Sequence, residues 1–154
     1  MRIAIGSDHA GYRLKEEVKK RFSSQQIEFS DFGVNCDEPA DYPDIAEPVA
    51  EAVARGEADL GILICGTGIG MTIAANKVPG IRAALCHDLF TARAAREHND
   101  ANILTLGERV IDPELACQIV SEWLRADFQG GRHARRLAKI RALEEKHCSC
   151  NGKK

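Results

Sequence analysis

The 154-residue sequence has few aromatic residues, no long apolar run and almost no excess of charge of either sign. Aromatic side chains make up 5% of it, and 21 basic against 23 acidic residues give a net charge of −2. A nucleic-acid-binding surface needs a basic face or aromatic side chains for stacking, so we expect no nucleic-acid partner. The balanced charge also provides no field that would attract an anionic membrane. Any anion that the protein binds must therefore be held by local groups.

The longest apolar run, Leu60 to Cys65, has the length of a strand and cannot span a membrane. The first residues enter a strand pattern without the apolar core and cleavage site of a signal peptide. We therefore expect a cytoplasmic protein. The six cysteines follow no compact disulfide framework, so reduced thiols are expected, and we assign Cys36, Cys86 and Cys117 to packing.

Apolar runs rich in branched residues recur along the chain, and a helical pattern follows each of them. The runs are Ile3 to Gly6, Ile27 to Phe32, Leu60 to Cys65, Arg82 to His87 and Ile103 to Gly107. Continuous apolar strands are buried on both faces, as in a parallel sheet covered by helices. The sequence therefore predicts a three-layer α/β fold around a five-stranded parallel sheet, in a single domain over residues 1–146.

Several helix boundaries can be read from local signals. Gly56 should close a helix over residues 44–55, and Asp112 should cap a helix whose first residue is Pro113. The last helix should run from Arg132 to about Lys146, after a break at Gly130-Gly131. Its apolar stripe is narrow, so we expect this helix to dock on a partner subunit, with His133 exposed on it. Residues 147–154 are expected to form a flexible tail.

Ligands of open parallel sheets bind beyond the carboxyl ends of the strands, so the residues after each strand are the first candidates for a site. Asp8 and His9 follow the first strand, and Arg109 follows the fifth. Asp8 could equally be only a helix cap. His98 and Asn99 end the helix after strand four; alternatively His98 complements the helix dipole and Asn99 takes a left-handed cap conformation.

The loop after the third strand carries the strongest local signal. Gly66, Gly68 and Gly70 expose backbone N–H groups before a helix that should begin near Met71, which would suit an oxyanion or a phosphate. The spacing fits neither a P-loop nor a dinucleotide site, and a tight packed turn remains the alternative. Cys65 precedes this loop, where the helix dipole favours a thiolate, although most cysteines are simply small buried side chains.

The last helix begins with a basic run, which is usually a solvated helix face. Arg132 and Arg136 are four residues apart and share one side, so their guanidinium groups could converge on one phosphate. The tail sequence His147-Cys148-Ser149-Cys150 superficially suggests a metal site, but a second pair of ligands is missing. We therefore expect no metal.

Taken together, these motifs resemble the ribose-5-phosphate isomerases of the B type and their relatives that isomerise allose and galactose 6-phosphates. The resemblance extends to about residue 146. The matching stretches are 6–11, 41–43 (Asp41-Tyr42-Pro43), 64–70, 74–77, 96–102 and 130–136.

The resemblance implies a Rossmann-like domain that works without cofactor or metal as a homodimer, or as a dimer of dimers, with active sites shared between subunits. Cys65 would be the base that moves a proton between C1 and C2, and His98 would open the sugar ring. The loop Gly66, Thr67, Gly68, Ile69 and Gly70 would hold the enediolate, with Thr67 as a catalytic member. Asp8 and Asn99 would bind sugar hydroxyls, and the phosphate would be bound by His9, Arg109, Arg132 and Arg136.

The expected function is the reversible conversion of ribose 5-phosphate to ribulose 5-phosphate in the pentose phosphate pathway. An isomerase of a six-carbon sugar phosphate is the alternative within the class. A different class would be a non-catalytic phosphate- or nucleotide-binding module that uses Cys65 as a redox thiol. The acid/base pair of Cys65 and His98 favours an enzyme.

Overall fold

The computed structural model describes residues 1–36 and 38–148. Its strands are β1 (Arg2–Ser7), β2 (Glu28–Asp31), β3 (Leu60–Cys65), β4 (Ala83–Leu85) and β5 (Ile103–Gly107). The helices are the short η1 (His9–Gly11), α1 (Tyr12–Phe22), α2 (Tyr42–Ala54), α3 (Ile69–Ala75), α4 (Leu89–Asn99), α5 (Pro113–Arg125) and α6 (Arg132–Cys148). The five strands form one parallel sheet in the order β2-β1-β3-β5-β4, which confirms the predicted fold class.

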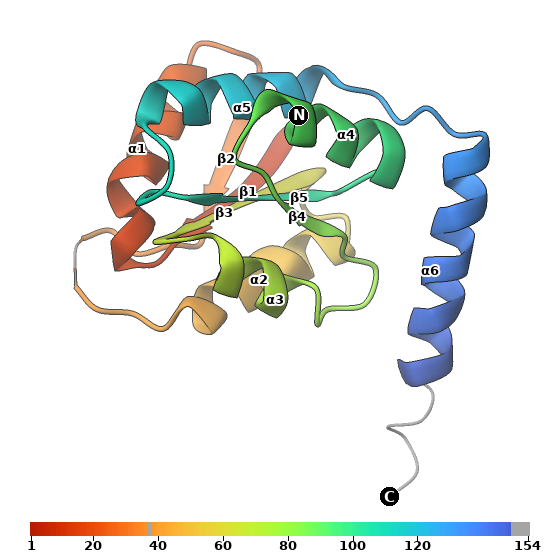
Figure 1. Ribbon diagram of the computed structural model, residues 1–154. Coiled ribbons are helices and arrows are strands. Elements are labelled where there is room, and N and C mark those ends of the chain that lie inside the picture. The colour runs from red at the N-terminus through yellow and green to blue at the C-terminus, as the bar shows by residue number, and fades with distance from the viewer. Residues whose placement is uncertain (37, 149–154) are drawn as a thin grey trace, which may run out of the picture.

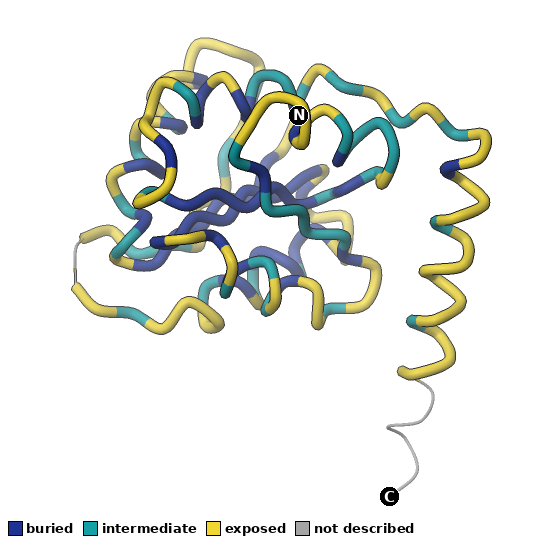
Figure 2. The backbone as a smooth tube through the Cα atoms, viewed as in Figure 1, coloured by how far each residue is buried: buried dark blue, intermediate teal, exposed yellow. Residues whose placement is uncertain are grey.

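The helices cover both faces of this sheet (Figure 1). Helices α1, α4 and α5 lie on one face, and α2 and α3 lie on the other. Alternate residues of each central strand face opposite layers: in β3, Ile62 and Ile64 pack toward the first layer, and Leu63 and Cys65 toward the second. All of β3 is buried, as Figure 2 shows along the centre of the molecule. Burial on both faces explains why the strand is continuously apolar.

The predicted helix boundaries are largely confirmed. The Asp112 carboxylate accepts the N–H of Leu115 at 2.8 Å, and Pro113 is the first residue of α5. Gly56 follows Arg55, the residue that caps the end of α2. Its φ of +73° is the left-handed conformation expected of a glycine that closes a helix. Helix α2 begins two residues earlier than predicted, at Tyr42.

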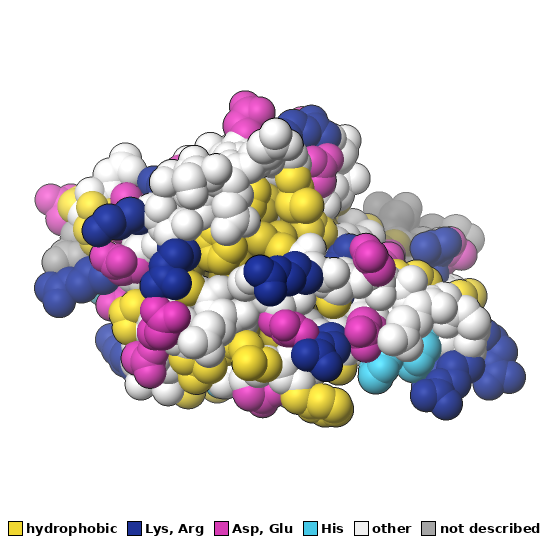
Figure 3. All heavy atoms as spheres, turned by 90° about the horizontal axis from the view of Figure 1, so that it is seen from above, with side chains coloured by type: hydrophobic (Ala, Val, Ile, Leu, Met, Phe, Trp, Pro, Cys, Tyr) yellow, Lys and Arg dark blue, Asp and Glu magenta, His cyan; other side chains and the backbone are white. Residues whose placement is uncertain are grey.

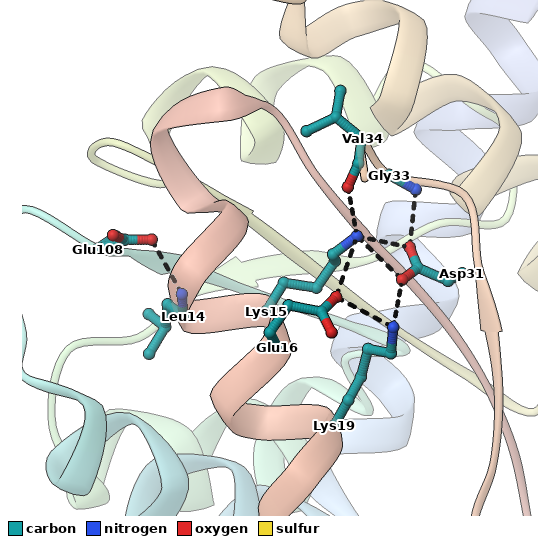
Figure 4. Close-up of polar contacts among 8 residues, drawn as sticks. All are labelled: Leu14, Lys15, Glu16, Lys19, Asp31, Gly33, Val34 and Glu108. Atoms are coloured by element: carbon teal, nitrogen blue, oxygen red, sulfur yellow. Dashed lines mark hydrogen bonds and ion pairs between the residues drawn. The ribbon is translucent and has the colours of Figure 1, made fainter. Parts of the chain in front are cut away.

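A buried lysine ties α1 to the edge strand β2 (Figure 4). The Lys15 side chain is fully buried, and its Nζ donates to Asp31 Oδ1 at 3.0 Å and to the Val34 carbonyl at 2.7 Å. Lys19 donates to Asp31 Oδ2 at 2.7 Å. Burial alone would raise the pKa of Asp31, but the hydrogen bonds from Lys19, Lys15 and the Gly33 N–H outweigh it and hold that pKa below its usual value.

Helix α6 stands away from the rest of the domain (Figure 1). It is almost entirely exposed (Figure 2), and Ile140 and Leu143 keep 48% and 58% of their surface accessible. Glu144 accepts the N–H of Gly80 at 3.0 Å, one of its few ties to the body. The prediction that the domain itself buries little of the apolar stripe of α6 is therefore confirmed.

Three details of the sequence analysis need correction or restriction. Cys36 is exposed, so it does not pack, because it lies in the surface segment after β2, whereas Cys86 and Cys117 are buried as predicted. The helical hydrogen bonding of α6 continues through His147 and Cys148, which were assigned to the tail. Residues 149–154, with Cys150, lie outside the described residues. None of the helices within the described ranges is long and apolar enough to cross a membrane.

Candidate active site

Residues at the ends of three strands meet at the carboxyl edge of the sheet. They line a cavity of about 260 Å³, which contains Asp8 and His9 after β1, Cys65 and Thr67 around the end of β3, and Arg109 after β5. Parallel strands place all their carboxyl ends at one edge, so these distant segments converge although the sequence separates them by up to a hundred residues. The predicted grouping of these five residues is thus observed.

Cys65 is the last residue of β3 and is 4% exposed. The N–H of Gly68 donates to its Sγ at 3.1 Å. A donor to sulfur stabilises the thiolate more than the thiol, because hydrogen bonds to a charged acceptor are the stronger ones. Cys65 belongs to the second core layer and also lines the cavity, whereas Cys86 does not line it. Burial raises the pKa of Cys86 to about 11.

The glycine loop is tighter than the sequence suggested. Helix α3 begins at Ile69, not near Met71, and Gly68 caps it with φ +77°. A Cβ on Gly68 would lie 2.5 Å from Leu85 Cδ1, so both conformation and space require glycine there. The Gly68 N–H is engaged by Cys65, and the N–H of Ile69 points to Thr67 Oγ1 at 3.3 Å. The loop therefore directs two of its N–H groups inward to its own side chains.

Asp8 both caps a helix and faces the cavity, so the two interpretations of its role are compatible. Its carboxylate accepts the N–H groups of Ala10 and Gly11 at 3.0 and 3.1 Å at the start of η1. Burial raises the pKa of Asp8, while His9, these two N–H groups and Arg109 partly oppose that increase. Nδ1 of His9 accepts the N–H of Ala40 at 3.2 Å, which leaves Nε2 as the proton-bearing nitrogen of the neutral ring.

Arg109 is held at the cavity by its backbone. Its N–H donates to the Gly66 carbonyl at 3.0 Å, and the N–H of the preceding Glu108 donates to the Cys65 carbonyl at 3.0 Å. The Arg109 guanidinium lies against Gly66, where a Cβ would be 3.2 Å from its Cζ. These contacts place a positive charge at the cavity that Cys65 lines, and a side chain at Gly66 would press on the Arg109 guanidinium.

Tyr42 completes this half of the site and was missed as a site residue. It is the first residue of α2, and its ring covers Gly70, where a Cβ would lie 2.7 Å from Tyr42 Cζ. Tyr42 lines the cavity with Cys65 and Arg109. The sequence showed Asp41-Tyr42-Pro43 only as a matching stretch, because a single aromatic residue at a helix start has no pattern of its own.

The other predicted site residues lie at the opposite edge of the sheet. Helix α4 runs back from the carboxyl end of β4, so His98 and Asn99 at its end are near the amino end of β5. Arg132 and Arg136 are on α6, which stands at that same end of the molecule (Figure 1). Six-residue strands such as β1 and β3 are about 20 Å long, so one chain does not bring His98 to its own Cys65. Within one chain these four residues therefore do not join the cavity that Cys65 lines, and the implied sharing of sites between subunits stays a prediction.

His133 is also not where the sequence placed it. It is 6% exposed and stacks on His98, with ring centroids 4.4 Å apart and an interplanar angle of 5°. Burial lowers its pKa, and the charges of His98, Arg132 and Arg136 lower it further. In Figure 3 the histidine side chains lie beside a group of basic side chains at one end of the molecule. The spacing of His133, Leu137, Ile140 and Glu144, which face the body along α6, could have indicated its burial.

The end of α4 differs from its predicted form in one further respect. Asp100, with φ +43°, takes the left-handed conformation that the sequence analysis considered for Asn99. Asn99 is therefore the last helical residue, and it is exposed next to the partly buried His98. No group of three or more His, Cys, Asp or Glu side chains in residues 1–36 and 38–148 could hold a metal ion.

Fold and site define a three-layer parallel α/β protein with a thiol, a carboxylate and an arginine at the carboxyl edge of its sheet. The family model described as ribose/galactose isomerase matches residues 3–140. The chain belongs to this family of enzymes, as its motifs predicted.

Individual relatives cover nearly the whole chain. Ribose-5-phosphate isomerase B of Escherichia coli is 48% identical over 94% of this chain and 97% of its own. The D-erythrulose-4-phosphate isomerase of Pectobacterium atrosepticum is 46% identical over 94% of this chain and 97% of its own. The structure of ribose-5-phosphate isomerase B from Clostridium thermocellum superposes with a TM-score of 0.94 at 58% identity, covering 96% of this chain and 99% of that one.

Proposed function

We propose that this protein interconverts ribose 5-phosphate and ribulose 5-phosphate through an enediolate, as a cytoplasmic enzyme of the pentose phosphate pathway. The observation that carries the proposal is the Cys65 thiol at the cavity, with the Gly68 N–H on its sulfur and Asp8 and Arg109 beside it. Aldose–ketose isomerisation needs a base, donors for the developing oxyanion and a phosphate anchor. The site has a candidate for each of these roles.

In the proposed reaction, the Cys65 thiolate removes the proton from C2 of the open-chain aldose. The C2–H electron pair then forms the C1–C2 double bond, and the C1 carbonyl oxygen becomes the oxyanion of the enediolate. The hydroxyl of Thr67 and the loop from Gly66 to Gly70 stabilise that charge. Return of the proton to C1, with proton transfer from O2 to O1, gives the ketose.

His98 acts earlier, by moving a proton when the furanose ring opens, a task suited to an imidazole near neutral pH. Asp8 and Asn99 bind sugar hydroxyls, and the phosphate dianion is anchored by His9, Arg109, Arg132 and Arg136. Because an anchored phosphate supplies binding energy away from the reacting carbons, it positions C1 and C2 against the thiol.

We further propose that two copies of the chain complete each site. His98, Asn99, Arg132 and Arg136 of one copy would reach the cavity of the other, because the two groups lie at opposite edges of one chain. An apolar groove of about 530 Å³ between α6 and the α4 and β4 region offers space for a segment of the second copy. A two-fold interface would make both sites equivalent.

The function is tested with purified protein, ribose 5-phosphate and EDTA, by following the formation of ribulose 5-phosphate. Metal-independent turnover is expected, since the proposed base and oxyanion donors are side chains and backbone N–H groups. Parallel assays with four-carbon and six-carbon sugar phosphates determine the preferred chain length, which the relatives leave open. Turnover of none of these substrates would contradict the proposal and leave a phosphate-binding module with a redox thiol; loss of activity with EDTA would contradict metal independence.

A further inference from the structure

Two threonine hydroxyls form a hydrogen-bond chain behind the glycine loop. Thr105 lies in the middle of β5 and is fully buried, and Thr72 lies in α3. Their Oγ1 atoms are 2.5 Å apart. Thr72 Oγ1 also donates to the carbonyl of Gly68 at 2.7 Å. This chain of hydrogen bonds thus leads from the core of the sheet to Gly68, the residue whose N–H contacts Cys65.

Counting protons gives this chain a direction. A hydroxyl has one proton, and that of Thr72 is used on the Gly68 carbonyl. The proton between the two hydroxyls must therefore belong to Thr105. Thr105 donates to Thr72, and Thr72 donates to Gly68.

The same peptide group continues the chain into the cavity. The carbonyl of Gly68 and the N–H of Ile69 belong to one peptide unit, and that N–H donates to Thr67 Oγ1 at 3.3 Å. Thr67 is thus an acceptor from inside the loop, which leaves its own hydroxyl proton available for another partner. Thr67 is exposed and lines the cavity with Cys65.

We propose that Thr72 and Thr105 are positioning residues, which orient the Gly68–Ile69 peptide so that the Thr67 hydroxyl donates its proton to the developing oxyanion. This inference rests on the proposed isomerase function. Hydrogen bonds aligned in one direction polarise one another, so a donor at the end of such a chain is strengthened by the donors before it. The chain also fixes Gly68, whose N–H contacts the Cys65 sulfur.

In a purely structural role, the hydroxyls of Thr72 and Thr105 would do no more than satisfy their own hydrogen bonds. A threonine that bonds the carbonyl four residues before it is common in helices, and a buried hydroxyl needs a partner wherever it lies. The two interpretations differ in their kinetic consequences. Only the positioning role predicts that loss of either hydroxyl affects the rate through Thr67.

The experiment compares Thr105→Val and Thr72→Val with the hydroxyl-retaining variants Thr105→Ser and Thr72→Ser. Each valine variant should lower kcat by about threefold to tenfold with little change in KM, a fraction of the 10²–10³-fold effect of deleting an oxyanion donor outright. The serine variants should recover most of the rate. Ser23→Ala is the control, because it also removes a hydroxyl that donates to a backbone carbonyl, that of Lys20 at the end of α1, away from the cavity. It should retain the wild-type kcat.

A double-mutant cycle decides between the two roles. In a Thr67→Val background, Thr105→Val should have no further effect on kcat, because the donor that it supports is already absent. Equal effects of Thr105→Val with and without Thr67 would overturn the proposal, as would a wild-type kcat in both valine variants. Thermal melts identify any variant that fails to fold, in which case the corresponding substitution at the other threonine is used.

The amide proton shift of Ile69, measured by NMR, gives a readout that does not depend on turnover. Thr105→Val should move this resonance, because the peptide loses its polarising donor, whereas Ser23→Ala should not. If wild-type protein isomerises no sugar phosphate, the proposed function fails, and the Ile69 shift still decides whether the hydroxyl chain orients this peptide. An unchanged shift in an active enzyme overturns the positioning role alone.

Discussion

The two edges of the sheet carry the two halves of the predicted site, and they are built differently. At the carboxyl edge, Cys65 and Asp8 are buried and held by backbone hydrogen bonds from neighbouring loops. At the opposite edge, Arg132 and Arg136 are exposed on a helix that the domain hardly touches. The buried ring of His133 stacks on the partly buried ring of His98 and joins that helix to α4.

This difference matches the demands of the proposed roles. A base that must meet a carbon-bound proton needs a fixed position, because small displacements are costly in rate. A phosphate anchor can be delivered by an exposed helix such as α6, whose arginines are free to reach a second copy. We infer that the rigid half performs the proton transfer and that the outer half recognises the substrate from the other subunit.

The largest expected effect is at the rigid edge. Cys65→Ala should lower kcat by about 10²–10⁴-fold, the usual contribution of a general base, while substrate still binds. It should also abolish exchange of the C2 proton with solvent, which NMR in deuterated water detects. Cys117→Ala is the control: it removes another buried thiol, in α5 and outside the cavity, and should keep the rate. Proton exchange that persists without Cys65 would assign the base to another group.

The second prediction tests whether the two edges belong to one site. Cys65→Ala and His98→Asn, each feeble alone, are unfolded together and refolded. If the halves come from different chains, each mixed dimer has one intact site, so activity should return to about one quarter of wild type, half of the dimers times half of their sites. Mixtures with Arg109→Ala and Arg136→Ala extend the test to the phosphate anchor.

The pair Cys65→Ala with Arg109→Ala is the internal control of that experiment. Both residues line the same cavity of one chain, so their mixture should stay at the baseline. If every mixture stays at the mutants' baseline although mass spectrometry shows that mixed dimers have formed, the two halves of a site do not come from different chains. A monomer in solution would contradict the two-copy arrangement as well.

A third comparison concerns stability at the two edges. Lys15→Met removes one of the two lysines that pair with the partly buried Asp31, so the free energy of unfolding should fall by about 2 kcal/mol. Glu144→Gln weakens the tie between α6 and Gly80 and should cost less than about 1 kcal/mol in the monomer. Lys20→Met, on the exposed face of α1, should be near neutral. Denaturant titrations measure all three, and equal losses for Lys15 and Glu144 would remove the contrast.

The smallest expected effect is a pH dependence at the outer edge. The pKa of His133 is lowered in the folded state, so between that value and about 6.5 the unfolded chain binds more protons than the folded one. The contribution to stability is therefore complete above about pH 6.5 and is lost as the pH falls through the folded pKa. His133→Gln should flatten the stability profile in this window. An unchanged profile would show that His133 does not titrate there.

Much of the fold was predictable because it follows from local periodicity. Continuous apolar runs such as Leu60 to Cys65 indicated buried parallel strands, and Asp112-Pro113 and Gly56 marked helix ends. Cys65 and Arg109 were also found from sequence, since residues that follow parallel strands share an edge. Tyr42 was not, because its partner Gly70 lies on another element and no spacing within the sequence records that contact. The burial of His133 was missed although the spacing along α6 could have indicated it.

The sequence by itself determined the strands, the helices and the half of the site that follows the strands, because each depends on neighbouring residues and on the common direction of a parallel sheet. Only the tertiary structure decided that His98 and the arginines of α6 lie at the other edge. A helix returning across the sheet carries its last residues one strand length away from where it began, and sequence order does not record that displacement. The tertiary structure also decided the burial of His133 and the alignment of Thr105, Thr72 and Gly68, since these contacts join separate elements.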